Sequence, residues 1–224
     1  MKKLEIACFN LESALIAQEN GADRVELCAD IHLGGTTPSI DIIQKAKANL
    51  IIPIYIMIRP RGGNFVYFDT EFQQMKDAIL KLKTLAINGF VFGILNEDHT
   101  INSNQNTELV NLAKPILCTF HRAFDEVINY KIALEEVVSC GFSTILTSGT
   151  FSNVMEGKEV LKALVLQAEN RIVIMPGGGL RSTNILELDE LVNAKFYHSS
   201  AITDGSEIAN PQEIIELKKR LSYT

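Results

Sequence analysis

The sequence predicts an α/β chain folded as a parallel (β/α)8 barrel, on three observations. Short, β-branched and continuously apolar runs alternate with helix-like stretches along the chain, as in parallel sheets covered on both faces. Six of these runs end in a small cluster of polar, reactive or glycine residues. The length of 224 residues suits one barrel. Because the carboxyl ends of all barrel strands open on one face, we expect the six clusters to form one site.

The first half of the chain supplies four strand–helix units. The first helix is expected to be capped by Asn10 and to stop at Gly21, and a polar loop over 34–39 follows the second strand. The expected strands are 3–8, 24–28, 54–59 and 90–95. The helices after them are expected over 10–20, 40–48, 70–87 and 107–113.

The second half of the chain repeats this alternation. Gly141 is expected to end the fifth helix, and Pro211 suits the first turn of the last one. The expected strands are 116–121, 144–147, 172–175 and 195–198, with helices over 130–139, 155–167, from 183 onward and 211–220. Since no linker, charge block or low-complexity segment interrupts the pattern, we predict a single TIM-like (β/α)8 domain over residues 1–224.

Composition and charge exclude several classes of protein. A net charge of −6 gives no basic footprint for nucleic acid, and no apolar run approaches the ~18 residues of a membrane span. The polar residues Glu5, Asn10 and Glu12 interrupt any apolar stretch of a secretory signal. Four cysteines without a CxxC pair argue against a zinc ribbon and a disulfide scaffold. We therefore expect a cytoplasmic protein in a reducing compartment, with neither a nucleic acid nor a membrane as partner.

Strand alternation predicts which side chains point into the barrel. Val25 and Leu27 suit the face covered by helices, so Glu26 and Cys28 are expected to point inward. The same alternation turns Arg59 inward on the third strand. A buried carboxylate is costly unless it is paired, so we expect a Glu26–Arg59 ion pair at the top of the barrel. Such a pair would either fill the barrel as a structural element or bind a substrate.

Two cysteines end adjacent strands and are candidate metal ligands. Cys8 and Cys28 follow the first and second strands, and a pair of thiolates selects soft ions such as Cu(I). The alternative is that both are buried as small apolar side chains, which is common for cysteine. Cys8 is also out of phase with an inward Glu5, unless the strand ends or bulges there.

Titratable residues at strand ends are candidates for catalysis. Histidine at such a position can be a general acid or base, a ligand, or a satisfied hydrogen-bonding group. An aspartate four residues after the first histidine can orient it or cap the next segment. The catalytic candidates are Glu26, His121, Asp125 and His198.

Arginines and glycines at the same end of the barrel predict an anion site. Arginine forks and the backbone N–H groups of a glycine-rich turn after the seventh strand both match phosphate or carboxylate oxygens. A tight turn without any ligand is the alternative for the glycines. The expected anion-binding residues are Arg59, Arg61, Arg122, Gly177, Gly178 and Gly179.

Seven motifs in order along the chain are highly specific in combination. They are GADRVELC at 21–28, GGTTPS at 34–39, MIRPRGGNF at 57–65, TFHRAFD at 119–125, LTSG at 146–149, MPGGG at 175–179 and HSS at 198–200. Together they resemble the CutC copper-homeostasis family. The resemblance implies a TIM-like barrel, a cytoplasmic location, homo-oligomerisation and a role in copper handling. It also implies that Cys8 and Cys28 correspond to the candidate Cu(I) thiols of the family.

The sequence is consistent with two functions. One is a copper-homeostasis protein that binds Cu(I) through cysteines, with Cu(I) as its only cofactor and no organic cofactor predicted. The other is an enzyme acting on a small phosphorylated or carboxylated metabolite. A barrel mouth with so many arginines, histidines and glycines is richer than two thiols require. The segment after Ser200 is shorter than in many relatives, which puts any site element from that insertion in doubt.

Overall fold

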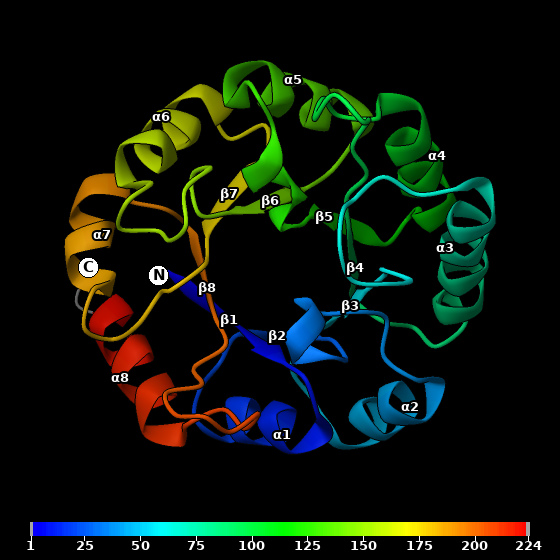
Figure 1. Ribbon diagram of the computed structural model, residues 1–224. Helices are drawn as coiled ribbons and strands as arrows, with labels where there is room; N and C mark the ends of the chain where they lie inside the picture. Colours follow the sequence, from blue (N-terminus) through cyan, green and yellow to red (C-terminus); the bar gives the residue numbers. More distant parts are fainter. Residues whose placement is uncertain (1, 223–224) are drawn as a thin grey trace.

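The computed structural model describes residues 2–222, in which eight parallel strands form a barrel inside a ring of eight helices (Figure 1). The TIM-like (β/α)8 fold is thereby confirmed. The ends of the expected range 1–224, residue 1 and residues 223–224, lie outside the described residues.

The strands and helices alternate strictly along the chain. The strands are β1 Lys3–Cys8, β2 Arg24–Leu27, β3 Ile54–Met57, β4 Gly89–Phe92, β5 Leu117–Phe120, β6 Thr144–Thr147, β7 Val173–Pro176 and β8 Phe196–Ser199. The helices are α1 Leu11–Glu19, α2 Ile40–Asn49, α3 Asp69–Lys83, α4 Ser103–Ala113, α5 Tyr130–Cys140, α6 Lys158–Ala168, α7 Ile185–Val192 and α8 Pro211–Ser222.

From β1 to β7 each strand pairs in parallel with the next, and β1 also pairs with β8. The remaining seam, between β7 and β8, is closed by a single bridge from Gly177 to His198. Gly177 leaves the space that this contact needs, because a Cβ there would lie 2.5 Å from Leu146 Cδ1 and 3.0 Å from His198 Cβ. The glycine therefore brings β7 against β8 at the carboxyl end of the barrel.

The expected elements are all present, with differences at their ends. Asn10 caps α1 as expected, since its Oδ1 accepts a hydrogen bond of 2.7 Å from the Ser13 N–H. Helix α3 ends at Lys83 rather than at 87. Strand β3 ends at Met57, two residues earlier than expected. The early end of β3 places Arg59 in a loop, which changes its partners.

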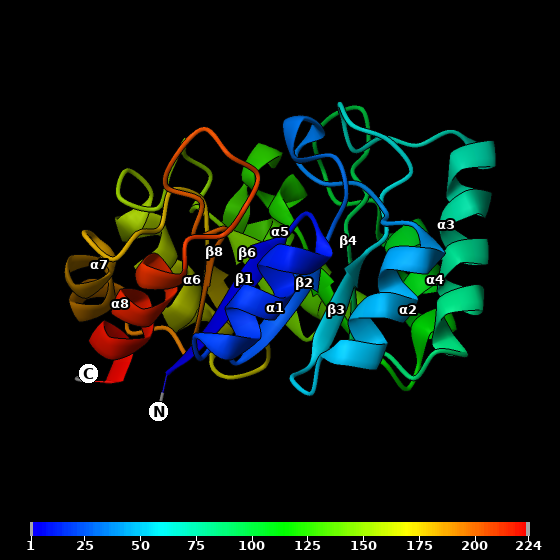
Figure 2. The ribbon, with the colours of Figure 1, turned by 90° about the horizontal axis from the view of Figure 1, so that it is seen from below.

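The core has two parts, on the two sides of the sheet. The larger part lies between the strands and the helices, and it includes Cys8. The smaller part fills the barrel interior with Cys28, Tyr55, Met57 and Val91. In the side view, loops after the strands rise at one end of the barrel, while the described chain begins and ends near the other (Figure 2). Within residues 2–222, none of the helices combines the length and apolar character needed to cross a membrane.

Candidate functional site

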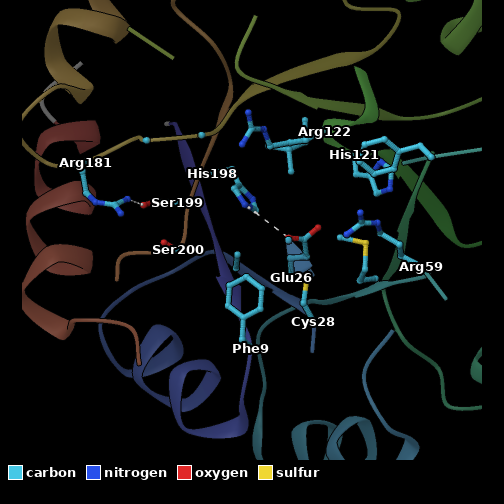
Figure 3. A pocket seen from close by; sticks show the side chains of 17 residues that line it. Phe9, Glu26, Cys28, Arg59, His121, Arg122, Arg181, His198, Ser199 and Ser200 are labelled. Atoms are coloured by element: carbon cyan, nitrogen blue, oxygen red, sulfur yellow. Dashed lines mark hydrogen bonds and ion pairs between the residues drawn. The ribbon is translucent and has the colours of Figure 1, made fainter. Parts of the chain in front are cut away.

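A cavity of about 280 Å³ lies at the carboxyl end of the barrel (Figure 3). Its walls come from the carboxyl ends of β1, β2, β3, β6 and β8 and from the segments that follow β1, β2, β3, β5, β7 and β8. Eight of the residues expected at a site line this one cavity, although they come from five different strand ends: Glu26, Cys28, Arg59, His121, Arg122, Gly178, Gly179 and His198. Reactive residues that are far apart in the sequence therefore lie around one cavity at the barrel mouth, as expected.

A buried chain of charged and polar groups forms one wall of the cavity. His198 Nδ1 lies 2.8 Å from Glu5 Oε1, and its Nε2 lies 3.8 Å from Glu26 Oε2. Glu5 is fully buried and also forms an ion pair with Arg24. Since Glu5 fixes one nitrogen of the His198 ring, the other nitrogen faces Glu26. Glu5 is a positioning residue that the sequence placed inward but not at the site.

The pKa values along this chain are shifted by burial and by the neighbouring charges. Burial raises the pKa of Glu26 to about 7, although His198 opposes this shift. Burial alone would lower the pKa of His198, but Glu5 and Glu26 raise it above its ordinary value. Burial would likewise raise the pKa of Glu5, but Arg24 and His198 hold it below its usual range. Glu26 can therefore gain and lose a proton near neutral pH, beside His198 and an anionic Glu5.

The expected ion pair between Glu26 and Arg59 is wrong. The Arg59 guanidinium instead donates to three backbone carbonyls, those of Leu33 (2.7 Å), Gly35 (2.9 Å) and Gly63 (2.7 Å). The reason is that Arg59 lies beyond the end of β3, where its backbone N–H donates to Thr37 Oγ1 and its side chain reaches the loops. Among the described residues, only His198 forms an ion pair with Glu26, and Glu26 Oε1 has no hydrogen-bond partner.

His121 is held in one orientation on the opposite wall. Its Nδ1 accepts a hydrogen bond of 3.3 Å from the Ala123 N–H, and its ring packs against Phe65 with 4.8 Å between ring centroids. The buried Nε2 has no hydrogen-bond partner among the residues that the structure describes. Burial and the charge of Arg59 lower the pKa of His121 to about 3. The ring is therefore neutral at physiological pH and carries its proton on Nε2.

Asp125 does not orient His121. Its carboxylate accepts hydrogen bonds from the Ser148 N–H (2.9 Å to Oδ1) and from Arg122 Nε (2.7 Å to Oδ2). Arg122 in turn donates from Nη2 to Ser148 Oγ at 3.0 Å. Asp125 thus connects the loop after β5 to the end of β6 and holds Arg122 at the rim of the cavity.

Of the other residues expected to bind an anion, some line the cavity and others do not. Arg61 does not line this cavity, because its Nε pairs with Glu71 Oε1 at 2.6 Å. The N–H of Gly177 donates to Thr147 O within the barrel, whereas Gly178 and Gly179 line the cavity.

Sequence reasoning missed Arg181 as a residue of the cavity wall. The Arg181 guanidinium donates to Ser199 Oγ at 3.2 Å and to the carbonyls of Leu180 and Ile202. Its position two residues after the triple glycine was the signal that could have identified it.

The two candidate metal-binding cysteines lie on opposite faces of the sheet. Cys8 stands in register with Leu27 and packs toward the helices, and its Sγ lies 3.4 Å from Ile6 O. Cys28 lies inside the barrel and lines the cavity. Burial, and next the nearby Glu26, raise the pKa of both thiols well above the ordinary value. Among residues 2–222, no three His, Cys, Asp or Glu side chains are grouped as metal ligands.

Comparisons with known proteins agree on one family. The sequence model described as CutC family matches residues 2–203. A copper homeostasis protein cutC homolog of Homo sapiens is 43% identical over 198 residues, which cover 88% of this chain and 72% of the human one. A family protein CutC of Photorhabdus laumondii is 41% identical over 201 residues, or 90% of this chain and 80% of that protein.

A solved structure gives the same result. The putative copper homeostasis protein CutC from Streptococcus agalactiae superposes with a TM-score of 0.86 at 35% identity. The superposition covers 91% of this chain and 100% of the other. The similarity therefore includes the barrel that carries the cavity.

Proposed function

This chain belongs to the CutC family, and we propose that this member is an enzyme that binds a small phosphorylated or carboxylated metabolite at the barrel mouth and transfers a proton on it. The proposal rests above all on Glu26. One of its carboxylate oxygens faces His198, while the other is buried at the cavity without a hydrogen-bond partner. A buried polar atom without a partner is costly, and active sites are where such groups are retained.

The arginines of the cavity support an anionic ligand. Arg59 is 4% exposed, and its guanidinium donates to backbone carbonyls and lies over the ring of Phe65. Arg181 is half-buried and bonded to carbonyls and a hydroxyl. Within the described part of the chain, neither arginine has a carboxylate within ion-pair distance. Since a buried cation without a counter-ion is unfavourable, a ligand phosphate or carboxylate would stabilise both.

Glu26 and His198 supply the proton-transfer groups. A general base is most effective when its pKa is near the working pH, and burial places the pKa of Glu26 at about 7. Glu5 holds His198 through Nδ1, so that the imidazole stabilises a Glu26 carboxylate through Nε2. The arrangement thus combines an anion-binding rim with a buried base, which is what proton transfer on a small charged metabolite needs.

The test is a search for ligand and turnover with matched variants. Calorimetry should detect saturable binding of inorganic phosphate, and then of members of a panel of phosphorylated and carboxylated metabolites. Any metabolite that binds is incubated in deuterated water and followed by NMR for loss of a carbon-bound proton. Glu26→Gln should abolish this exchange and keep ligand binding. The absence of saturable binding of every anion would overturn the proposal.

Binding of Cu(I) by Cys8 and Cys28 is the second candidate. It is favoured by the copper homeostasis named for the human relative and by the backbone hydrogen bond of 2.9 Å from Cys28 N–H to Cys8 O. Because the two sulfurs lie on opposite faces of the sheet, a shared ion would require one strand end to turn over. Loss of one bound Cu(I) per chain in both Cys8→Ser and Cys28→Ser under anaerobic titration would support it. Retention in both would overturn it.

The cellular setting is part of the same proposal. Four free and buried cysteines suit a reducing compartment, and we place the protein in the cytoplasm on that basis. Homo-oligomerisation is proposed from the family resemblance and is tested by light scattering.

A further inference from the structure

His121 offers a hydrogen bond that no protein group within residues 2–222 accepts. Its Nδ1 accepts from the Ala123 N–H, so the single proton of the neutral ring is on Nε2. That Nε2 is buried and has no hydrogen-bond partner in the described part of the chain. A buried N–H donor without an acceptor is unfavourable, and a ligand that accepts the bond would remove this cost.

The position of the His121 ring is fixed from several sides. Phe65 packs against it at 4.8 Å, and Phe120 meets it edge-on at 6.1 Å between ring centroids. Gly93 approaches from the neighbouring strand, where a Cβ would lie 2.9 Å from Nδ1. A donor that is held before the ligand arrives loses little entropy on binding and is aimed at one place in the cavity.

The surroundings of His121 suit its ring to donate a hydrogen bond rather than to act as a cationic acid. The Arg59 guanidinium and burial both keep the ring neutral, with a pKa of about 3. A neutral imidazole cannot act as a cationic acid, but it can donate to a carbonyl oxygen and stabilise the negative charge that develops there. The combination of a glutamate base with a neutral histidine donor is a known solution for proton abstraction beside a carbonyl.

On the basis of the proposed function, we infer that the substrate carries a carbonyl group beside its phosphate or carboxylate, and that His121 Nε2–H donates to that carbonyl oxygen. The free Glu26 Oε1 lines the same cavity and takes the proton from the adjacent carbon. The C–H bond breaks, an O–H bond forms on Glu26, and the electron pair moves to give an enolate. In a substrate that carries a hydroxyl on that carbon, the hydroxyl proton moves to the former carbonyl oxygen and Glu26 returns its proton to the former carbonyl carbon. The product is the isomeric hydroxy-carbonyl compound, and no external oxidant or reductant is needed.

Two probes with the same phosphate separate this inference from simple anion binding. Phosphoglycolohydroxamate has a planar group that mimics an enediolate, whereas ethyl phosphate has none. In the unmodified protein, calorimetry should show the hydroxamate binding about tenfold more tightly, the equivalent of one hydrogen bond to a buried donor. In His121→Phe, which keeps an aromatic ring without the donor, the two affinities should become equal. His121→Gln, which restores an N–H donor, should recover part of the preference.

The outcomes distinguish the two levels of the proposal. Equal affinity for both probes in the unmodified protein, or a preference unchanged in His121→Phe, would overturn the role of His121 and leave the anion site standing. If neither probe, nor inorganic phosphate, nor any carboxylated metabolite of the panel binds, the proposed function fails as well.

A measurement on the unmodified protein covers the case in which the variants do not fold. Long-range ¹H–¹⁵N correlation spectra should show His121 neutral and protonated on Nε2 from about pH 5 to 8. Protonation on Nδ1, or titration within this range, would overturn the inference.

Discussion

His198 stands directly opposite Glu5 in the register of β8 and β1, and its Nδ1 lies 2.8 Å from Glu5 Oε1. The two side chains meet inside the barrel, where Arg24 forms a second ion pair with the same carboxylate. This contact joins the first and last strands and at the same time orients the histidine that faces Glu26. One buried carboxylate therefore serves both the closure of the barrel and the site.

The first prediction concerns this carboxylate. Glu5→Gln should lower the free energy of unfolding by about 3–5 kcal/mol, because it leaves the buried charge of Arg24 without its partner. Urea denaturation followed by circular dichroism measures the change. The control is Glu135→Gln, which breaks a solvent-exposed pair with Arg171 and should leave the denaturation midpoint unchanged. Equal stability of Glu5→Gln and the parent would show that Glu5 does not hold the barrel.

The second prediction concerns protection by anions. Phosphate or sulfate should raise the melting temperature, and the rise should be lost in Arg181→Met, which removes a cavity arginine that no carboxylate neutralises. Arg171→Met changes an arginine of the α6–β7 surface and should keep the full effect. Cys28→Ser should keep it too, because the thiol supplies no charge. Equal protection of Arg181→Met and the parent would place the anion elsewhere.

The third prediction concerns pH. Burial raises the pKa of Glu26 from 4.5 to about 7, so this group contributes stability that is full below about pH 4.5 and is lost as the pH rises through about 7. Glu26→Gln keeps a neutral side chain at every pH. The free energy of unfolding of Glu26→Gln, relative to that of the parent protein, should therefore increase by about 2–3 kcal/mol between pH 5 and pH 8.

The comparison with Glu26→Gln is needed because other buried groups titrate as well. His198 also has a raised pKa and adds a loss of stability in the same direction as the pH rises. His121 has a lowered pKa and acts in the opposite direction below pH 6.5. Denaturation of both proteins across this range isolates Glu26, and a difference that is constant with pH would contradict its assignment.

The fourth prediction concerns the β7–β8 seam. Gly177→Ala should destabilise the barrel by about 1–3 kcal/mol, because the new methyl group would meet Leu146 and His198. The matched control is Gly205→Ala, since a Cβ there has no heavy atom within 4 Å. Thermal denaturation of the two variants tests the contrast. If Gly177→Ala were as stable as Gly205→Ala, the close contact between β7 and β8 at Gly177 would not contribute to the stability of the barrel.

The sequence predicts the fold well because each unit is local. A strand of the barrel needs only an apolar run and a turn, and residues two apart share a face, so Glu26 and Cys28 were correctly assigned to the interior. The same rule explains the difficulty at Cys8, which is out of phase with Glu5 and packs on the outer face. Alternation holds only while the strand lasts, and Arg59 lies two residues beyond its end.

The partners within the site were harder to predict. The Glu5–His198 contact depends on the register between the first and last strands, which no local pattern fixes. The orientation of Arg181 depends on a loop that wraps back to Ser199. Asp125 follows His121 by four residues, but the short helical turn between them directs it to Arg122 and β6 instead. Strand register decided the first of these cases, and loop conformation decided the other two.

The bond between Glu5 and His198 joins residues that are 193 positions apart. During synthesis on the ribosome, the first strand emerges long before the residue that completes its ion pair. A growing chain that has not yet reached β8 lacks the histidine beside Glu26 and the strand that closes the barrel. Only the assembled protein can therefore hold the pair of groups proposed to move protons, and an incomplete translation product would be inactive for that reason.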